Sequence, residues 1–159
     1  MSANEQPSMD GELGKLIGAH KAIIDQEKAA AQARRDAEAS FSAAFDSWCK
    51  HTAKPAIEHA AAQLKAAGHE VSLRMPTREI ETVKFEFTPQ RVHGANRTLP
   101  SATLSFECQP VGQKVRVKLE KSGGSRIPNS DQTVTLDELT IGKVNEWVLA
   151  VVRSTLPQD

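Results

Sequence analysis

The amino-acid sequence predicts an α+β fold, with helices packed on one face of a five-stranded antiparallel meander sheet. Apolar residues recur every three or four positions up to Gly68 and again after Thr140, which is typical of helices. Between these points apolar and polar residues alternate, which is typical of strands with one buried face. With 159 residues, of which 39% are hydrophobic, the chain is long enough to form one core without disulfides or metal ions.

The order of elements begins with a disordered lead over residues 1–9, followed by a long helix from Asp10 to about Lys54. Asp10 is the candidate N-cap, because its carboxylate can accept hydrogen bonds from the free amides of a first turn. All five phenylalanines and both tryptophans lie after residue 40, which predicts a globular α+β domain over residues 41–157. Residues 10–40 are then predicted to be a helical extension that serves as a self-association segment. Its large apolar residues follow helical spacing: Leu13, Leu16, Ile17, Ile23 and Ile24.

Pro55 predicts an interruption of the long helix. Proline has no backbone N–H, and it disfavours the helical conformation at the residue before it, here Lys54. We expect the helix to break or kink there and a second helix to start with Pro55 in its first turn. The second helix is expected to stop at Gly68, a candidate C-cap.

Five alternating stretches predict the strands, and the proline and glycine turns between them favour a sequential meander. Their apolar members are Val71, Leu73 and Met75; Val83, Phe85 and Phe87; Ala102, Leu104, Phe106 and Cys108; Val115, Val117 and Leu119; Val134 and Leu136. A last helix is predicted from about Ile141 to Thr155, with Thr140 as N-cap and Trp147 on its apolar stripe.

The composition excludes some classes of partner. Twenty basic residues balance twenty acidic ones, so the chain lacks the long-range field of a dedicated nucleic-acid binder. No apolar run approaches the roughly 18 residues of a membrane span, and the polar N-terminus lacks the apolar core of a signal peptide. We therefore expect a cytoplasmic protein with no membrane partner.

The sequence points to no catalytic residue, metal site or cofactor. The five histidines are nowhere three or four positions apart, the spacing at which a helix presents two metal ligands on one face. Cys49 and Cys108 each lie on an apolar stripe, which favours inert core cysteines over nucleophiles. Motifs for phosphate, dinucleotide or zinc binding and the nucleophile elbow are absent. An enzymatic activity thus has no positive argument.

Two predicted loops carry more basic than acidic residues, although the chain as a whole is neutral. In a sequential meander, the turns after the second and fourth strands emerge at the same end of the sheet. Together they form a predicted basic rim for an anionic partner, made of Arg91, His93, Asn96, Arg97, Lys121 and Arg126. Arginine offers a bidentate fork for phosphate or carboxylate, although hairpin loops are commonly polar without binding anything. Nucleic acid has little further support, because the polar sheet face has no aromatic residue for base stacking.

These patterns lead to two hypotheses of function. The first is a non-enzymatic interaction module that self-associates through residues 10–40, or binds another protein there, and that binds an anionic partner at the basic rim. His20 lies on the apolar stripe, so association is expected to weaken in mild acid. The alternative is a small-molecule-binding domain or enzyme with a pocket between the sheet and the C-terminal helix. Its lining would be Phe85, Phe87, Phe106 and Trp147, which core packing alone also explains.

Overall fold

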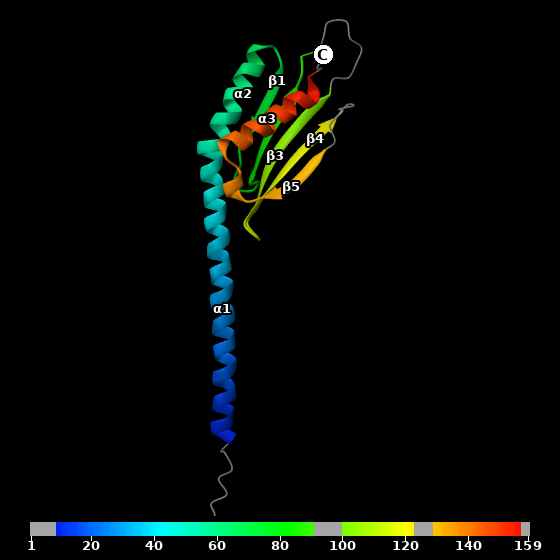
Figure 1. Cartoon of the computed structure of the whole chain (residues 1–159). Coiled ribbons are helices and arrows are strands. Elements are labelled where there is room, and N and C mark those ends of the chain that lie inside the picture. Colours follow the sequence, from blue (N-terminus) through cyan, green and yellow to red (C-terminus); the bar gives the residue numbers. More distant parts are fainter. Residues whose placement is uncertain (1–8, 91–99, 123–128, 157–159) are drawn as a thin grey trace, which may run out of the picture. The chain divides into compact units, whose positions relative to one another are not determined.

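The structure, a computed structural model that describes residues 9–90, 100–122 and 129–156, confirms the predicted α+β fold (Figure 1). The helical part comprises α1 (Met9–Trp48), the π-helical turn η1 (Cys49–Ala53), α2 (Lys54–Ala66), the 3-10 turn η2 (Leu136–Glu138) and α3 (Ile141–Thr155). The strands are β1 (Glu70–Arg74), β2 (Thr82–Thr88), β3 (Ser101–Gln109), β4 (Lys114–Ser122) and β5 (Ser130–Val134). Contacts divide the chain into two units, one ending at Glu38 and the other beginning at Ala39.

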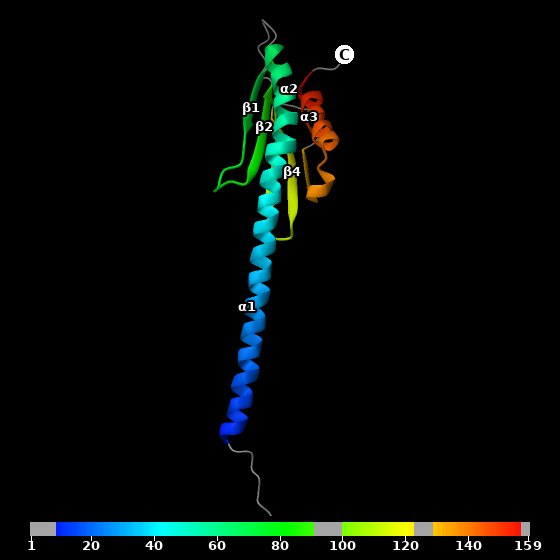
Figure 2. The same cartoon turned by 90° about the vertical axis from the view of Figure 1, so that its left-hand side faces the viewer.

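The sheet is the expected antiparallel meander, with the strand order β1-β2-β3-β4-β5. Its register places Phe85 opposite Leu73 on one side and opposite Leu104 on the other, and Leu104 opposite Leu119. Side chains alternate strictly between buried and half-buried along β2 and β3. This alternation gives the sheet one apolar face, which both α2 and α3 help to cover through the shared core. Figure 2 shows these two helices next to each other, as their contacts require.

The last strand lies earlier in the sequence than predicted. We expected Val134 and Leu136 to alternate on one strand, but β5 ends at Val134 and Leu136 lies in η2. Thr135 explains the stop, because it caps η2 in a capping box with Glu138, whose carboxylate accepts a hydrogen bond of 3.1 Å from the Thr135 amide. Most side chains of β5 are polar and exposed, because an edge strand need not bury its side chains. The alternation of apolar residues therefore could not reveal where this strand begins.

The second helix starts with Pro55 in its first turn as predicted, and the interruption before it is a π-helical turn and not a break. The residues before Pro55 form η1, in which the Lys54 amide donates to the Cys49 carbonyl five residues earlier. A π-helical turn is wider than an α-helical one, so it accommodates the missing donor and the bulk of the proline ring. Asp10 was also wrongly predicted as the N-cap, because α1 already includes Met9 and Asp10 lies in its first turn.

Gly68 ends α2 as predicted, one position past the C-cap residue Ala67. Its φ of +94° belongs to the left-handed region. The Gly68 amide donates to the Lys65 carbonyl at 2.9 Å and the His69 amide to the Leu64 carbonyl at 3.0 Å. These two bonds form a Schellman motif, which satisfies the last free carbonyls of the helix and turns the chain toward β1.

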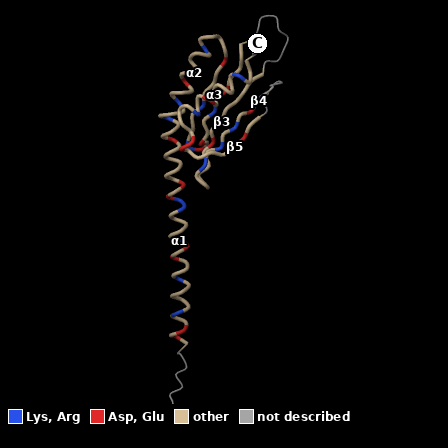
Figure 3. Tube along the Cα trace, viewed as in Figure 1, with Lys and Arg blue, Asp and Glu red and all other residues tan. Residues whose placement is uncertain are grey.

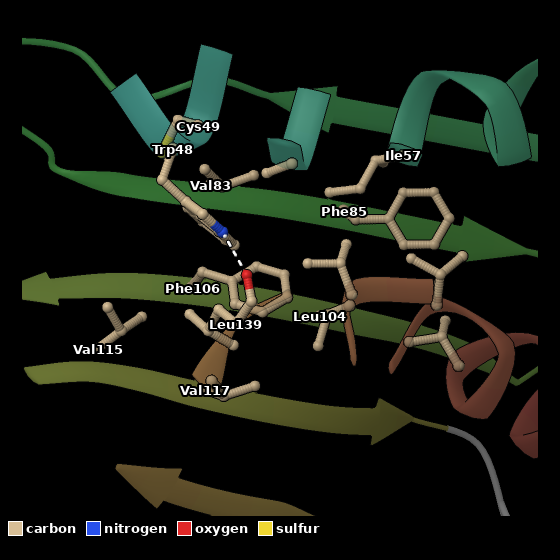
Figure 4. Close-up of a cluster of buried hydrophobic side chains, with 14 of the residues drawn as sticks. Trp48, Cys49, Ile57, Val83, Phe85, Leu104, Phe106, Val115, Val117 and Leu139 are labelled. Carbon is tan, nitrogen blue, oxygen red and sulfur yellow. Dashed lines mark hydrogen bonds between the residues drawn. The ribbon is translucent and has the colours of Figure 1, made fainter. Parts of the chain in front are cut away.

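The core of the second unit is built around aromatic residues from separate elements (Figure 4). The ring of Trp48 stacks on Phe45 at 5.6 Å between centroids and meets Phe106 edge-on at 5.2 Å. Its indole N–H donates a buried hydrogen bond of 2.8 Å to the Leu139 carbonyl, just before α3. That bond fixes the end of α1 to the start of α3 without leaving a buried polar group unpaired.

The C-terminal helix α3 agrees with its prediction. It runs from Ile141 to Thr155, and the Thr140 hydroxyl accepts a hydrogen bond of 3.2 Å from the Lys143 amide, as an N-cap does. Val144, Val148 and Val151 are buried in the shared core, so one stripe of the helix faces the sheet.

Candidate association site

The first unit presents a continuous apolar surface on a single helix. We call it the association face and define it by Leu13, Leu16, Ile17, Ile23 and Ile24. Four of these side chains are largely exposed, Leu13 by 50%, Leu16 by 67%, Ile17 by 61% and Ile23 by 53%, and Ile24 is half-buried. The first buried residue of α1 is Phe41, in the second unit. Within the first unit the helix therefore buries none of these large side chains.

The association face is one stripe because of helical geometry. At about 100° per residue, all five side chains lie within about 60° of the direction of His20. The stripe spans residues 13–24, which corresponds to about 17 Å along the helix axis. His20 thus lies at the centre of an apolar surface, in the position that a core residue of a helix pair would occupy.

The remaining faces of this helix are charged and mixed. Figure 3 shows lysine, arginine, aspartate and glutamate interspersed along α1. In the part of the helix that follows the association face, the Gln32 side-chain amide donates to the Asp36 carboxylate at 2.9 Å. This solvent-exposed pair lies one turn apart. Pairs of this kind stabilise a helix by a few tenths of a kcal/mol and leave it polar. The exposed large apolar side chains of residues 10–38 therefore all belong to the association face.

The basic rim lies almost entirely outside the described residues. Arg91, His93, Asn96, Arg97 and Arg126 fall in residues 91–99 and 123–128, so their predicted convergence remains a prediction. The stems of the two loops do lie at one end of the sheet, because Ser101 pairs with Ser122 and their hydroxyls are 2.6 Å apart. Lys121 is on this stem, where its amide donates to the Asn129 side-chain oxygen at 2.9 Å and burial lowers the pKa of its ammonium group.

Both cysteines are buried, as their positions in the sequence predicted. Burial raises the pKa of the Cys49 thiol from 9.0 to about 12, and the nearby Asp46 carboxylate adds to the shift. Burial also raises the pKa of the Cys108 thiol to about 12, with a further contribution from a hydrogen bond to Glu81. Both groups are neutral thiols at physiological pH, which is the unreactive form.

Sequence reasoning did not foresee a small polar cluster beside Cys108. The Ser42 hydroxyl donates to a Glu81 carboxylate oxygen at 3.1 Å, across 39 positions of the sequence. These two residues, with Lys50 and Arg78, line a surface hollow of about 540 Å³. The hollow holds acidic and basic groups together, and Lys50 is paired with Asp46 at 2.8 Å. No spacing rule links Ser42 to Glu81, because only the folded chain brings them together.

The aromatic residues proposed for a small-molecule pocket are packed in the core instead. Phe85, Phe87 and Phe106 are fully buried, and Trp147 is half-buried against the same cluster. Two further hollows lie near the first strand, one lined by Val71, Leu73 and Met75 and the other by Lys65, His69 and Glu86. None of the three hollows is lined by the four aromatics, so these residues serve the core packing.

Metal ligation and membrane crossing would each require a specific arrangement of the described residues. No three histidine, cysteine, aspartate or glutamate side chains of residues 9–90, 100–122 and 129–156 are arranged to hold a metal ion. Over the same residues, every helix is too short or too polar to cross a membrane. Comparison of the chain with protein-family models, with curated proteins and with solved structures finds no match.

Proposed function

We propose that this protein is an interaction module that self-associates through the association face of α1. The observation that carries the proposal is the exposure of four large apolar side chains on one stripe of a helix that buries no large side chain before Phe41. Contiguous apolar patches on a soluble protein commonly mark an interaction site. A second copy of the same face is always available to cover it, and like faces pair readily in symmetric dimers.

The free energy of burying apolar surface favours a dimer in which the two association faces cover each other. Each half-exposed leucine or isoleucine gains about 1 kcal/mol when it is buried, so ten such residues in a pair of helices contribute about 10 kcal/mol. The cost of association is about 4 to 15 kcal/mol, which is of the same order. The balance predicts a dimer whose population depends on protein concentration.

The helix also needs a partner for its own stability. Gly14 and Gly18 lie within this stretch, and no other group lies within 4 Å of where their side chains would be. Each glycine costs about 1 kcal/mol relative to alanine in a helix interior. An isolated helix of this composition is marginal in water, so packing against a partner would stabilise it.

Light scattering of the full chain tests the proposal. We expect a dimer or larger species at tens of micromolar and a monomer for the variant Leu13→Ser/Ile17→Ser/Ile24→Ser. The matched control, Ala22→Ser/Ala29→Ser/Ala33→Ser, adds three serines to the opposite side of the same helix and should remain associated. The control separates loss of the apolar face from loss of helix propensity.

Two outcomes would contradict the proposal. A wild-type monomer whose residues 13–24 are already protected from hydrogen exchange would show that the segment folds back on its own chain. A wild-type monomer with an unprotected segment would favour the runner-up, in which the segment folds as an amphipathic helix on another protein. An anionic partner at the basic rim and a small-molecule ligand remain predictions of the sequence.

A further inference from the structure

The association face continues into charged residues at the same helical spacing. Positions that alternate by four and three run from Leu13 through Ile17, His20 and Ile24, which are core positions of a coiled coil. The same spacing then reaches Glu27, Ala31, Arg34 and Glu38. All of these residues are helical and belong to the first unit. The charges therefore restrict how two copies of this helix can pair.

A parallel pair in register would bring like charges together. In that arrangement each core residue packs against its own copy, so Glu27 would meet Glu27, Arg34 would meet Arg34 and Glu38 would meet Glu38. Like charges in contact are repulsive, and removing them from water adds a further cost. The helix continues unbroken through residue 38, so these positions would stay close in a parallel pair. The pattern therefore opposes the parallel orientation.

We propose that two copies pair in antiparallel orientation over residues 10–28, with the two-fold axis near Ala19. This inference rests on the proposed self-association and specifies its partner and geometry. Leu13 of one copy then packs in the layer of Ile24 of the other, Leu16 in that of Ile23, and Ile17 in that of His20. Every residue of the association face thus packs against an isoleucine, a leucine or the imidazole ring of His20 from the other copy.

The charges at the margin of this overlap are complementary. Asp10 and Lys28 both lie about 80° from the direction of His20, on the same side of the stripe. In an antiparallel pair, residues on the same side of the apolar stripe of each helix face each other. Asp10 of each copy therefore lies beside Lys28 of the other. Arg34 and Glu38 extend past Met9, the first helical residue of the other copy, and do not meet their own copies. Glu27 and its copy are offset by about 24 Å along the axis. The antiparallel pair thus buries the apolar residues and keeps these like charges apart.

Cysteine cross-linking of the full chain distinguishes the two orientations. Leu13→Cys and Ile24→Cys are oxidised separately and as an equal mixture. In the antiparallel pair the two positions share a layer, whereas like positions are about 16 Å apart along the axis, beyond the roughly 7 Å that a disulfide spans. We expect at least a tenfold excess of the mixed product over like-with-like products. Wild-type protein, whose own two cysteines are buried, is the control and should not cross-link.

A second measurement leaves the association face intact. Ala29 lies on the opposite side of the helix from His20, so Ala29→Cys can carry a spin label without entering the interface. The labels should be about 40 Å apart in the antiparallel pair, because Ala29 and its copy are offset by about 30 Å along the axis, and about 25 Å apart in a parallel pair. A distance near 25 Å, or preferred like-with-like cross-links, would overturn the antiparallel arrangement and leave self-association in place. A monomer by light scattering would overturn both.

Discussion

At the scale of single residues, Cys49 and Cys108 show how burial decides reactivity. A thiol becomes a nucleophile only as thiolate, and burial disfavours that charged form. Asp46 beside Cys49 and Glu81 beside Cys108 are acidic neighbours, so they oppose ionisation further. A reactive cysteine usually has the opposite surroundings, a cationic group or a helix N-terminus. These two side chains therefore contribute to the packing of the core.

We predict that both thiols react slowly with a disulfide reagent in the native protein at pH 8. With each pKa near 12 instead of 9.0, the thiolate population of each cysteine is about a thousandfold lower than in the unfolded chain. Adding denaturant should expose both and restore the rate of a free cysteine. A rapidly reacting thiol in the native protein would contradict the burial and reopen the case for a cysteine nucleophile.

Burial of these cysteines was readable from the sequence, but their neighbours were not. The period of the apolar residues placed Cys49 and Cys108 on buried faces, because side-chain direction follows from local backbone geometry. The carboxylate of Glu81 reaches Ser42 only through tertiary folding. Local patterns therefore predict which side of an element is buried, and they carry no information about which distant polar groups meet.

At the scale of elements, predictions were most accurate where local chemistry and tertiary packing agree. The alternation in β2 and β3 and the cap at Thr140 are strong local signals, and the structure confirms them. Two predictions held only in part. Pro55 lies in the first turn of α2 as expected, but the π-helical turn η1 joins α2 to α1 without a break. A fifth strand is present, but it ends at Val134, because Leu136 begins η2.

Gly68 allows a direct test of the end of α2. We predict that Gly68→Ala lowers the free energy of unfolding by about 1 to 2 kcal/mol, because an alanine at a φ of +94° is strained. The added methyl group would also lie 2.6 Å from the side-chain oxygen of Gln90, which can move aside.

Denaturant unfolding measures the effect of Gly68→Ala, and two variants serve as controls. Gly68→Asn should be milder than the alanine variant, because asparagine tolerates the left-handed region better. Gly18→Ala, in a helical position with open space around it, should not destabilise the protein. Equal stability of wild type and Gly68→Ala would show that the Schellman geometry is absent in solution.

At the scale of the whole molecule, the candidate site is an exposed face and not a cavity. The sequence could place the association face because helix periodicity alone defines it, and its five residues do lie on one stripe. The basic rim depends on loop conformation, which neither propensity nor pattern determines, and only the stems at Ser101 and Ser122 are fixed by the register. The net charge of zero leaves apolar contact as the main driving force for the proposed association.

In the proposed pair, His20 would make the apolar contact sensitive to pH. Its imidazole would lie among Ile17, Ile23 and Ile24, and Lys21 follows it on the same helix. An imidazolium there would lose its hydration, so the dimer would bind fewer protons than two monomers. By linkage, the proposed association weakens in mild acid.

We predict that the dissociation constant of the dimer rises by about tenfold or more from pH 7.5 to pH 5.5, because a buried imidazolium loses its hydration and each dimer holds two of them. Sedimentation equilibrium at the two pH values measures the change. His20→Leu should bind more tightly and abolish the dependence, because leucine fills the same position without a charge. His51→Gln, at an exposed position of the second unit, should retain it. If the wild-type dimer is equally stable at both pH values, His20 lies outside the interface, and the pairing must use another face of the helix.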